Sequence, residues 1–565
     1  MFNKEIFYVL LILNFSIMIC HRCGADLLMK KLNLNNSKVF IEGNRRRLSD
    51  EYFPIRVKID YTLLNTQYNR REISDTNYEL FKQELDKMPE YLGNIISVKR
   101  ETFNKNSLVE AINIFRIFFN ENKFLEFFNF KKNCIYDQLT ISDLNYDISS
   151  YDLFVFPRID KSQVKNNAIA AAGHCVLSGA TLRPIVGMII LNDNLNSKKD
   201  IEYYIKNSIF HEFFHILGFN TNFFEGKSFN DSNYIYLNSP KMLERAKIHF
   251  GCENLKGLRL ENQGTKGTIG SHWDARFMQG ELMIGEDYSE IVLSDITLAF
   301  LEDLGYYQIN YYTGGLFRFG KNQGCAFLEK NCINGNGVLF SNEFCAEPSK
   351  ALCTGSHTSK GSCYIAQYNY IESSFRYFTN PRIGGKIMTD YCPISFYNQK
   401  DDNYNYPMNC VYGKKEYNDE VIGNNSICFE SSVNLNVNAT ICYQIQCDRV
   451  NKKFTVFIGN KQIICDGEEK TLEVSSSDTL NCPDYNMVCT SDIWCNNMFD
   501  CIDKKSLTDE NTFLYVTNKD KLLEKDIYNL NLDDNTKYDL KINNNHNNII
   551  SYNWIMLFSL VFAFM

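Results

Sequence analysis

The chain has 565 residues, 44% of them hydrophobic and 14% aromatic, so it is long enough for two or three domains with buried cores. Its net charge is −8, and its basic residues are dispersed except for the triplet Arg45-Arg46-Arg47. A surface that follows nucleic-acid phosphates needs clustered basic residues, so we expect no nucleic-acid partner.

Twenty cysteines are the strongest feature of the composition. Fifteen of them lie between Cys325 and Cys501, and no tandem pair has the spacing of a zinc ribbon. The set therefore predicts disulfides. Because disulfides persist in oxidising compartments, we expect an extracellular protein.

Residues 1–20 form the first recognisable segment. A short polar start is followed by an apolar run from Ile6 to Cys20, which only Asn14 and Ser16 interrupt. This pattern is typical of a signal peptide and is short for a membrane span; an N-terminal anchor helix is the alternative.

Residues 21–95 are charged and poor in cysteine, which predicts a pro-segment whose end is fixed only to within tens of residues. Alternating apolar positions predict one strand, from Ile55 to Leu64.

A mixed α and β pattern follows over residues 96–310, where we expect the catalytic domain. Helical periodicity covers Asn106 to Phe128, and compact apolar runs at Tyr151–Ile159 and Pro184–Leu191 predict buried strands. A capping box formed by Ser197 and Asp200 then opens a long apolar helix. The predicted fold class is therefore α+β.

The C-terminal part of the chain changes character. Residues 311–505 are rich in turns and cysteines, which predicts a disulfide-stabilised domain. Residues 506–548 form a polar stalk, and the short apolar end at 549–565 indicates a GPI-attachment signal better than a spanning helix. We therefore expect a cell-surface protein on a GPI anchor. Four glycosylation sequons agree with secretion: Asn35, Asn230, Asn424 and Asn438.

The long helix carries the sequence His211-Glu212-Phe213-Phe214-His215. Residues four apart lie on one face of a helix, so both imidazoles can reach a single zinc ion. Glu212 can reach a metal-bound water, where a general base is needed. Gly218 follows three residues after His215 and allows the chain to leave the helix in a left-handed turn, as at the start of the metzincin pattern.

Catalytic zinc normally has a third protein ligand, but the compact pattern would place it at position 221, which is Thr221. We favour His272, because Met283 follows it at a plausible interval and a methionine beneath three histidines is the other metzincin hallmark. The residues that chemistry leaves open as alternatives are His249, Glu225, Glu244 and Glu253.

The chain resembles the leishmanolysin-type metallopeptidases, whose pattern has an insertion of several tens of residues before the third histidine. Here that insertion runs from Phe219 to Ser271. The resemblance covers roughly residues 150–400 and rests on these further segments: Gly267 to Trp273, Glu281 to Met283, Phe300 to Tyr307, Gly320 to Cys325, Asp390 to Pro393 and His249 to Cys252. The last of these assigns His249 to a structural helix.

The resemblance implies a metzincin-like catalytic domain with a cysteine-rich C-terminal domain and one zinc ion per chain. It also implies a zymogen in which Cys23, in His21-Arg22-Cys23, occupies the fourth zinc position as a thiolate. If Cys20 leaves with the signal peptide and Cys23 with the pro-segment, eighteen cysteines remain, an even number that allows nine bridges.

The implied activity is a zinc endopeptidase that hydrolyses peptide bonds in proteins, with a possible further role in cell adhesion. One rival is a zinc peptidase whose third ligand is a glutamate of the insertion. The other is a catalytically silent surface adhesion or coat protein of the same fold. The intact Glu212 and the two motif histidines favour the active enzyme, because a silent relative has no chemical reason to keep them.

Overall fold

The fold is that of a computed structural model, which describes residues 40–41, 51–101, 108, 146–159, 170–193, 201–231, 234–264, 267–286, 290–311, 317–335, 337–396, 408–411, 413–423, 425–435, 437–448, 450–467 and 470–489. Several predictions lie outside these residues: the signal peptide, Cys23, most of the helix over 106–128, the capping box at Ser197, the stalk and the C-terminal apolar segment. Within the described ranges, no helix is both long and apolar enough to cross a membrane.

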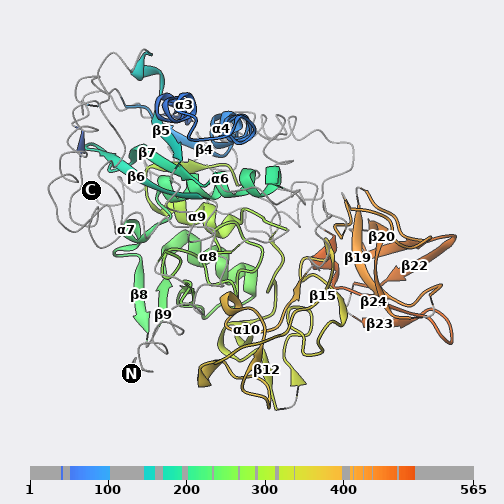
Figure 1. Cartoon of the computed structure of the whole chain (residues 1–565). Coiled ribbons are helices and arrows are strands. Elements are labelled where there is room, and N and C mark those ends of the chain that lie inside the picture. The colour runs from blue at the N-terminus through green and yellow to red at the C-terminus, as the bar shows by residue number, and fades with distance from the viewer. Residues whose placement is uncertain are drawn as a thin grey trace, which may run out of the picture.

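A five-stranded sheet in the order β1-β6-β7-β5-β3 forms the centre of the first half of the chain (Figure 1). β5 and β7 pair in parallel, β6 runs antiparallel to β7, and nearly every residue of these three strands is buried. The two predicted buried strands are confirmed. The strand bounds are β1 Phe40–Ile41, β3 Val57–Ile59, β5 Leu153–Ile159, β6 Ala170–Ser178 and β7 Pro184–Leu191.

The strand predicted from Ile55 to Leu64 is wrong in its second half. β3 ends at Ile59, and helix α3 (Thr62–Asn69) begins three residues later. The carboxylate of Asp60 accepts a hydrogen bond from the backbone N–H of Thr62 at 2.9 Å. This local turn competes with the extended backbone and starts the helix.

Two long helices, α4 (Asp75–Ile95) and α6 (Ile201–Leu217), pack against each other and flank the sheet. The side chain of Ser74 caps α4 by accepting the N–H of Asn77 at 3.2 Å. The rings of Tyr91 on α4 and Phe210 on α6 meet edge to face, with centroids 6.3 Å apart. Since α4 shares one hydrophobic cluster with α6, residues 52–99 belong to the same core as the histidine helix.

Three short strands close this core beside α4. They form an antiparallel sheet in the order β11-β4-β2, with bounds β2 Tyr52–Pro54, β4 Ile96–Lys99 and β11 Tyr307–Ile309.

The described part of the predicted insertion contains a small three-stranded sheet, the single-turn helix α7 and the longer helix α8. Pro240 opens α8 at its first turn, and Gly251 ends it with a left-handed backbone at φ 65°. The carboxylate of Asp303, at the end of α9, accepts the first N–H groups of α8, so the two helices pack together (Figure 1). The bounds are α7 Thr221–Phe224, β8 Ser228–Asp231, β9 Tyr234–Leu237, α8 Pro240–Phe250, β10 Leu258–Arg259 and α9 Asp295–Asp303.

Residues beyond 317 contain little helix and most of the disulfides that the structure describes. Short elements come first: α10 Cys325–Glu329, β12 Ile333–Asn334, β13 Gly337–Val338, β14 Ala351–Cys353, β15 Lys360–Cys363, β16 Ala366–Gln367, β17 Ile383–Gly384 and β18 Ser395–Phe396. A six-stranded antiparallel sheet in the order β22-β21-β20-β19-β24-β23 follows, with its own core (Figure 1). Its bounds are β19 Ser426–Ser431, β20 Ala439–Asp448, β21 Lys453–Ile458, β22 Lys461–Cys465, β23 Lys470–Glu473 and β24 Thr479–Cys482.

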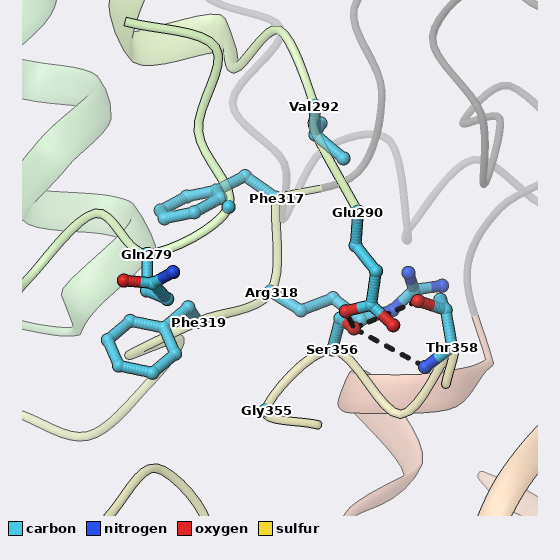
Figure 2. Close-up of a pocket in the computed structure, with 10 residues that line it drawn as sticks. Gln279, Glu290, Val292, Phe317, Arg318, Phe319, Gly355, Ser356 and Thr358 are labelled. Carbon is cyan, nitrogen blue, oxygen red and sulfur yellow. Dashed lines mark hydrogen bonds between the residues drawn. The ribbon is translucent and has the colours of Figure 1, made fainter. Parts of the chain in front are cut away.

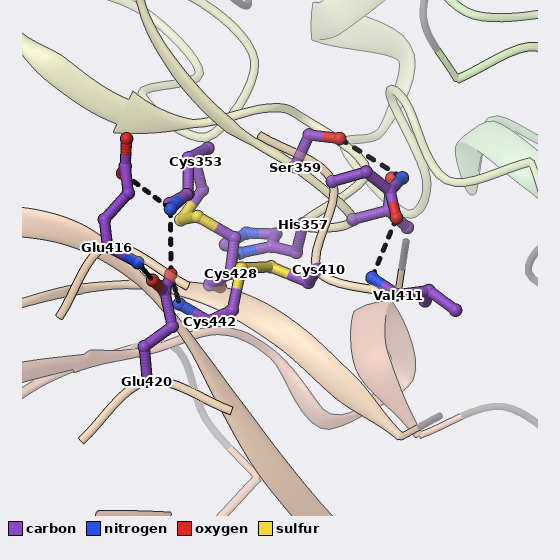
Figure 3. Close-up of a disulfide and its surroundings, with 12 residues drawn as sticks. Cys353, His357, Ser359, Cys410, Val411, Glu416, Glu420, Cys428 and Cys442 are labelled. Atoms are coloured by element: carbon purple, nitrogen blue, oxygen red, sulfur yellow. Dashed lines mark hydrogen bonds and ion pairs between the residues drawn. A yellow bond between two sulfur atoms is a disulfide. The ribbon is translucent and has the colours of Figure 1, made fainter. Parts of the chain in front are cut away.

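Seven disulfides join all of the described cysteines except Cys175. Figure 3 shows two of them side by side: Cys428 and Cys442 face each other across β19 and β20, and each is bridged to a cysteine outside this sheet, Cys353 at the end of β14 and Cys410. The pairs are Cys252–Cys325, Cys332–Cys392, Cys345–Cys363, Cys353–Cys428, Cys410–Cys442, Cys447–Cys489 and Cys465–Cys482. The α+β class and the disulfide-rich C-terminal region are therefore confirmed.

Candidate metal centre

Helix α6 presents His211 and His215 on one face, as the spacing predicts. Both side chains are buried, and their Nε2 atoms are 3.0 Å apart. The helix ends at Leu217, and Gly218 turns the chain away with a φ of 129°, which favours glycine. A Cβ at this position would also lie 2.7 Å from the side chain of Leu304, so space as well as backbone requires glycine.

His272 joins these two histidines from the far end of the insertion. Its Nε2 lies 3.2 Å from that of His215, and its ring stacks on the ring of His211 with centroids 5.3 Å apart. Within the described part of the chain, these three histidines are the one group of three or more side chains of the ligand types His, Cys, Asp and Glu placed to share a metal ion.

The alternative third ligands lie elsewhere. Glu225, Glu244 and Glu253 are all exposed, whereas the three histidines are buried. His249 lies in α8, where its Nε2 is 2.8 Å from the carbonyl of Phe319 and its ring stacks on Phe317. The prediction that His249 belongs to a structural helix is confirmed.

Each of the three imidazoles has its Nδ1 against a backbone carbonyl, at 2.6 Å for His211 and His215 and at 2.9 Å for His272. Because a carbonyl only accepts hydrogen bonds, Nδ1 carries the proton and the lone pair of each Nε2 points to the common centre. The three carbonyls belong to Leu282, Phe219 and Thr268.

Three converging lone pairs repel one another unless a cation lies between them. Two nitrogens bound at about 2.0–2.1 Å to a tetrahedral zinc ion are roughly 3.3 Å apart, close to the 3.0 and 3.2 Å separations of the Nε2 atoms here. Burial lowers the pKa of His211 to about 4 and that of His215 well below its ordinary value, so both rings are neutral near pH 7. The donor set therefore fits a divalent metal such as zinc.

Glu212 is completely buried and follows His211 on α6. One residue along a helix turns the side chain by about 100° around the axis, so Glu212 lies beside the face that carries the histidines. The helix geometry therefore agrees with the sequence prediction that Glu212 lies next to the ligand face without sharing it.

The segment around Met283 lies against two of the histidine elements. The carbonyl of Leu282 contacts His211, and the carbonyl of Met283 accepts the N–H of Trp273, which follows His272, at 2.9 Å. Met283 itself is fully buried. The predicted pairing of Met283 with the His272 segment therefore has a direct backbone contact.

The sequence analysis assigned no role to Glu281, although its side chain holds the segment around Met283 in place. Its buried carboxylate accepts the N–H of Met283 at 2.5 Å and the hydroxyls of Ser294 and Thr297 at 2.9 and 2.6 Å. Thr297 in turn accepts the indole N–H of Trp273 at 2.8 Å. Burial raises the pKa of Glu281 to about 7, against these hydrogen bonds, which lower it. The sequence signal for this role was the position of Glu281 two residues before Met283.

A separate pocket lies where residues 279–292 face residues 317–358 (Figure 2). The carboxylate of Glu290 lies within it and accepts hydrogen bonds from the hydroxyls of Thr354 and Ser356. Arg318 lies beside it and donates its Nε–H to the carbonyl of Met487 at 2.6 Å. The pocket contains none of the three histidines, so we do not assign the reaction to it.

These features define a metzincin-like metal centre. A mixed sheet lies beside a helix with two histidines, and the chain leaves that helix at a glycine with positive φ. A third histidine joins the first two and precedes a buried methionine. The family model described as leishmanolysin matches residues 137–495. The chain therefore belongs to the leishmanolysin family.

Individual relatives agree at moderate identity. A leishmanolysin homolog of Crithidia fasciculata is 32% identical over 223 residues, which is 37% of this chain and 34% of that protein. A leishmanolysin-like peptidase of Caenorhabditis elegans is 30% identical over 376 residues, covering 52% of this chain and 56% of the relative. A leishmanolysin-like peptidase of Drosophila pseudoobscura pseudoobscura is 23% identical over 454 residues, or 64% and 66% of the two chains. The chain thus spans between about a third and two thirds of the length of these relatives.

Proposed function

We propose that this protein is a zinc endopeptidase that cleaves peptide bonds in proteins, with His211, His215 and His272 as ligands and Glu212 as general base. The observation that carries the proposal is the convergence of three buried imidazole nitrogens at a helix that also carries a buried glutamate. The family supports a metallopeptidase activity and protein substrates.

Zinc held by the three Nε2 atoms would supply a Lewis acid for the scissile carbonyl and for a water molecule. The carboxylate of Glu212 takes a proton from the attacking water and later gives a proton to the nitrogen of the leaving amine. The carbonyls at Nδ1 keep each imidazole in the tautomer that leaves Nε2 free for the metal. Burial of Glu212 removes competing water from the base.

Glu212→Gln tests the proposal. The variant should keep about one zinc per chain and lose about 10²–10⁴-fold or more of its peptidase activity, because the base is removed and the ligands stay. Zinc is measured by atomic emission and activity on a generic protein substrate. Glu244→Gln, at an exposed position of α8, is the matched control and should remain fully active. Near-normal hydrolysis by Glu212→Gln would remove Glu212 from the mechanism.

We also propose that the enzyme is made as a zymogen with Cys23 as the inhibitory thiolate. The predicted end of the pro-segment near residue 95 would remove α4 and β3, which share the core of α6. We therefore place the cleavage earlier, within residues 42–51, a stretch that includes the Arg45–Arg47 triplet. N-terminal sequencing of the active form checks this position, and a mature chain that starts after Ile95 would contradict it.

We finally propose that the protein is displayed at the cell surface on a GPI anchor, as a glycoprotein with a role in cell adhesion. The apolar segment at 549–565 after an Asn-rich stretch supports the anchor, and the exposed positions of Asn230 and Asn438 suit glycosylation. A phosphatidylinositol-specific phospholipase should release the mature protein from cells. Recovery of the intact C-terminal peptide in the membrane fraction would favour a spanning helix instead.

A further inference from the structure

A buried cluster of charged side chains includes Asp274, two residues after His272. The guanidinium of Arg259, in β10, pairs through Nε with the carboxylate of Asp274 and through Nη2 with that of Asp390. All three side chains are at most 7% exposed. Asp274 stands two residues after His272, whereas Asp390 belongs to the cysteine-rich region. One arginine therefore joins the third histidine segment to a distant part of the chain.

Backbone hydrogen bonds also join residues 259–261 to residues 272–274. The carbonyl of Arg259 accepts the N–H of Asp274 at 3.2 Å, and the carbonyl of His272 accepts the N–H of Glu261 at 2.9 Å. The position of His272 thus follows the position of residues 259–261. Contacts that hold Arg259 in place therefore also help to set the direction from which the imidazole of His272 approaches the other two.

The guanidinium has little freedom to change its orientation. Its central carbon lies 4.3 Å from the ring centre of Tyr234 and 4.6 Å from that of Phe277. Aromatic faces on a planar cation favour one orientation of the plane, and the two carboxylates fix its rotation within that plane.

Asp390 is itself a fixed anchor. It ends a short turn, where its N–H donates to the carbonyl of Ile387 at 3.0 Å and its backbone is left-handed at φ 53°. Cys392, two residues later, is bridged to Cys332. The disulfide-stabilised region therefore presents its carboxylate to Arg259 from a constrained loop.

We propose that Arg259 is a positioning residue for the metal centre, and that through it Asp390 of the cysteine-rich region orients the ligand His272. This inference rests on the proposed zinc function. Asp390→Asn would leave Arg259 paired with Asp274 alone, with one strong charge-assisted contact fewer to hold the guanidinium. Loss of partners that orient metal ligands typically weakens metal binding by about 10–100-fold.

The test compares zinc affinities of the purified mature chain, measured by competition with a chelating dye. Asp390→Asn should bind zinc about 10–100-fold more weakly than wild type, and Arg259→Lys, which keeps the charge but loses the fork that reaches both carboxylates, should do the same. The visible absorption spectrum of the Co²⁺-loaded protein should also change in both variants, because it reports the ligand geometry.

The matched control is Glu420→Gln. Glu420 forms a buried pair with Lys360 at 2.9 Å in the cysteine-rich region, beside the paired disulfides (Figure 3). Its loss should lower the stability of the fold without changing zinc affinity or the Co²⁺ spectrum.

The outcomes separate the two proposals. If the wild-type protein does not bind zinc, the proposed function is wrong. Wild type that binds zinc, with Asp390→Asn within about threefold of it, would overturn the positioning role, because outer partners normally cost more. Equal weakening in Glu420→Gln would also overturn it, since affinity would then follow general stability. If Asp390→Asn does not fold, Arg259→Lys decides the question by the same criteria.

Discussion

The two halves of this molecule achieve order by different means. The described residues between 51 and 311 are organised around one hydrophobic cluster that contains the histidine helix, and this cluster extends as far as Phe396. Of the seven disulfides that the structure describes, six lie within residues 332–489, and the seventh, Cys252–Cys325, ties the insertion to the start of that region. The sheet formed by residues 426–482 keeps a separate, smaller core.

The two halves therefore have different proposed roles, one in the reaction and one in stabilising the fold. The proposed ligands and base all lie in the first half, on elements whose positions depend on packing and buried hydrogen bonds. The second half supplies covalent constraint and a carboxylate at its border with the first. Substitutions of the proposed ligands or base in the first half should therefore change function. Substitutions in the second half, apart from Asp390 at its border, should mainly change stability.

The largest expected effect comes from substitution of His272, and the second buried histidine in this part of the chain, His249, provides the comparison. His272→Ala should lose bound zinc and reduce activity by more than the 10–100-fold that an outer partner costs, because a ligand itself is removed. His249→Ala should keep about one zinc per chain, since Nε2 of His249 lies against the carbonyl of Phe319 and His249 is not part of the group of three histidines. Zinc analysis of both folded variants checks this, and zinc loss from His249→Ala alone would reverse the assignment.

A second prediction removes one constraint from the cysteine-rich half. The bridge Cys465–Cys482 closes a loop with a sequence separation of 17 residues, and both cysteines are buried. The double substitution Cys465→Ala and Cys482→Ala should lower the free energy of unfolding by about 3 kcal/mol. Its kcat/KM should stay at the wild-type level below the unfolding transition. A loss of activity in a folded double variant would show that this sheet contributes to the chemistry.

The smallest effect concerns the pH dependence of stability. Glu281 has an ordinary pKa of 4.5 and a folded-state pKa raised to about 7 by burial. Between these values the folded state holds more protons than the unfolded state, so the free energy of unfolding falls as the pH rises. Glu281→Gln carries no such proton. Urea denaturation of the metal-free proteins from pH 4.5 to 7 should show wild type losing stability relative to the variant, and a constant difference would exclude this origin.

Much of the candidate site followed from the sequence because its signals are local. The spacing of His211, His215 and Gly218 is set by one helix and its end, and Pro184–Leu191 is an uninterrupted apolar run. His272 required the position of Met283 and the family resemblance, since 57 residues of chain separate it from His215.

Other features carried weak or misleading signals. β6 begins with three alanines and a glycine, which do not favour a strand, and it is ordered by pairing with β7. Helix α4 was missed within the expected pro-segment, although Ser74 and the buried positions Phe81, Leu85 and Leu92 have helical spacing. The partners of Arg259 lie 15 and 131 residues away, so no local pattern indicates them.

The course of the insertion suggests how its length can change. The chain leaves the metal centre at Gly218 and returns at Ser271, and on return it is bound to residues 259–261 by backbone hydrogen bonds. The metal centre therefore contacts the insertion near its two ends, through the carbonyls of Phe219 and Thr268, and through the pairing of residues 259–261 with the His272 segment. Closing a flexible loop costs only about 0.6 kcal/mol more for each doubling of its length. The exposed end of β8, at Asn230 and Asp231, is thus a site where residues can be exchanged while the three imidazoles keep their geometry.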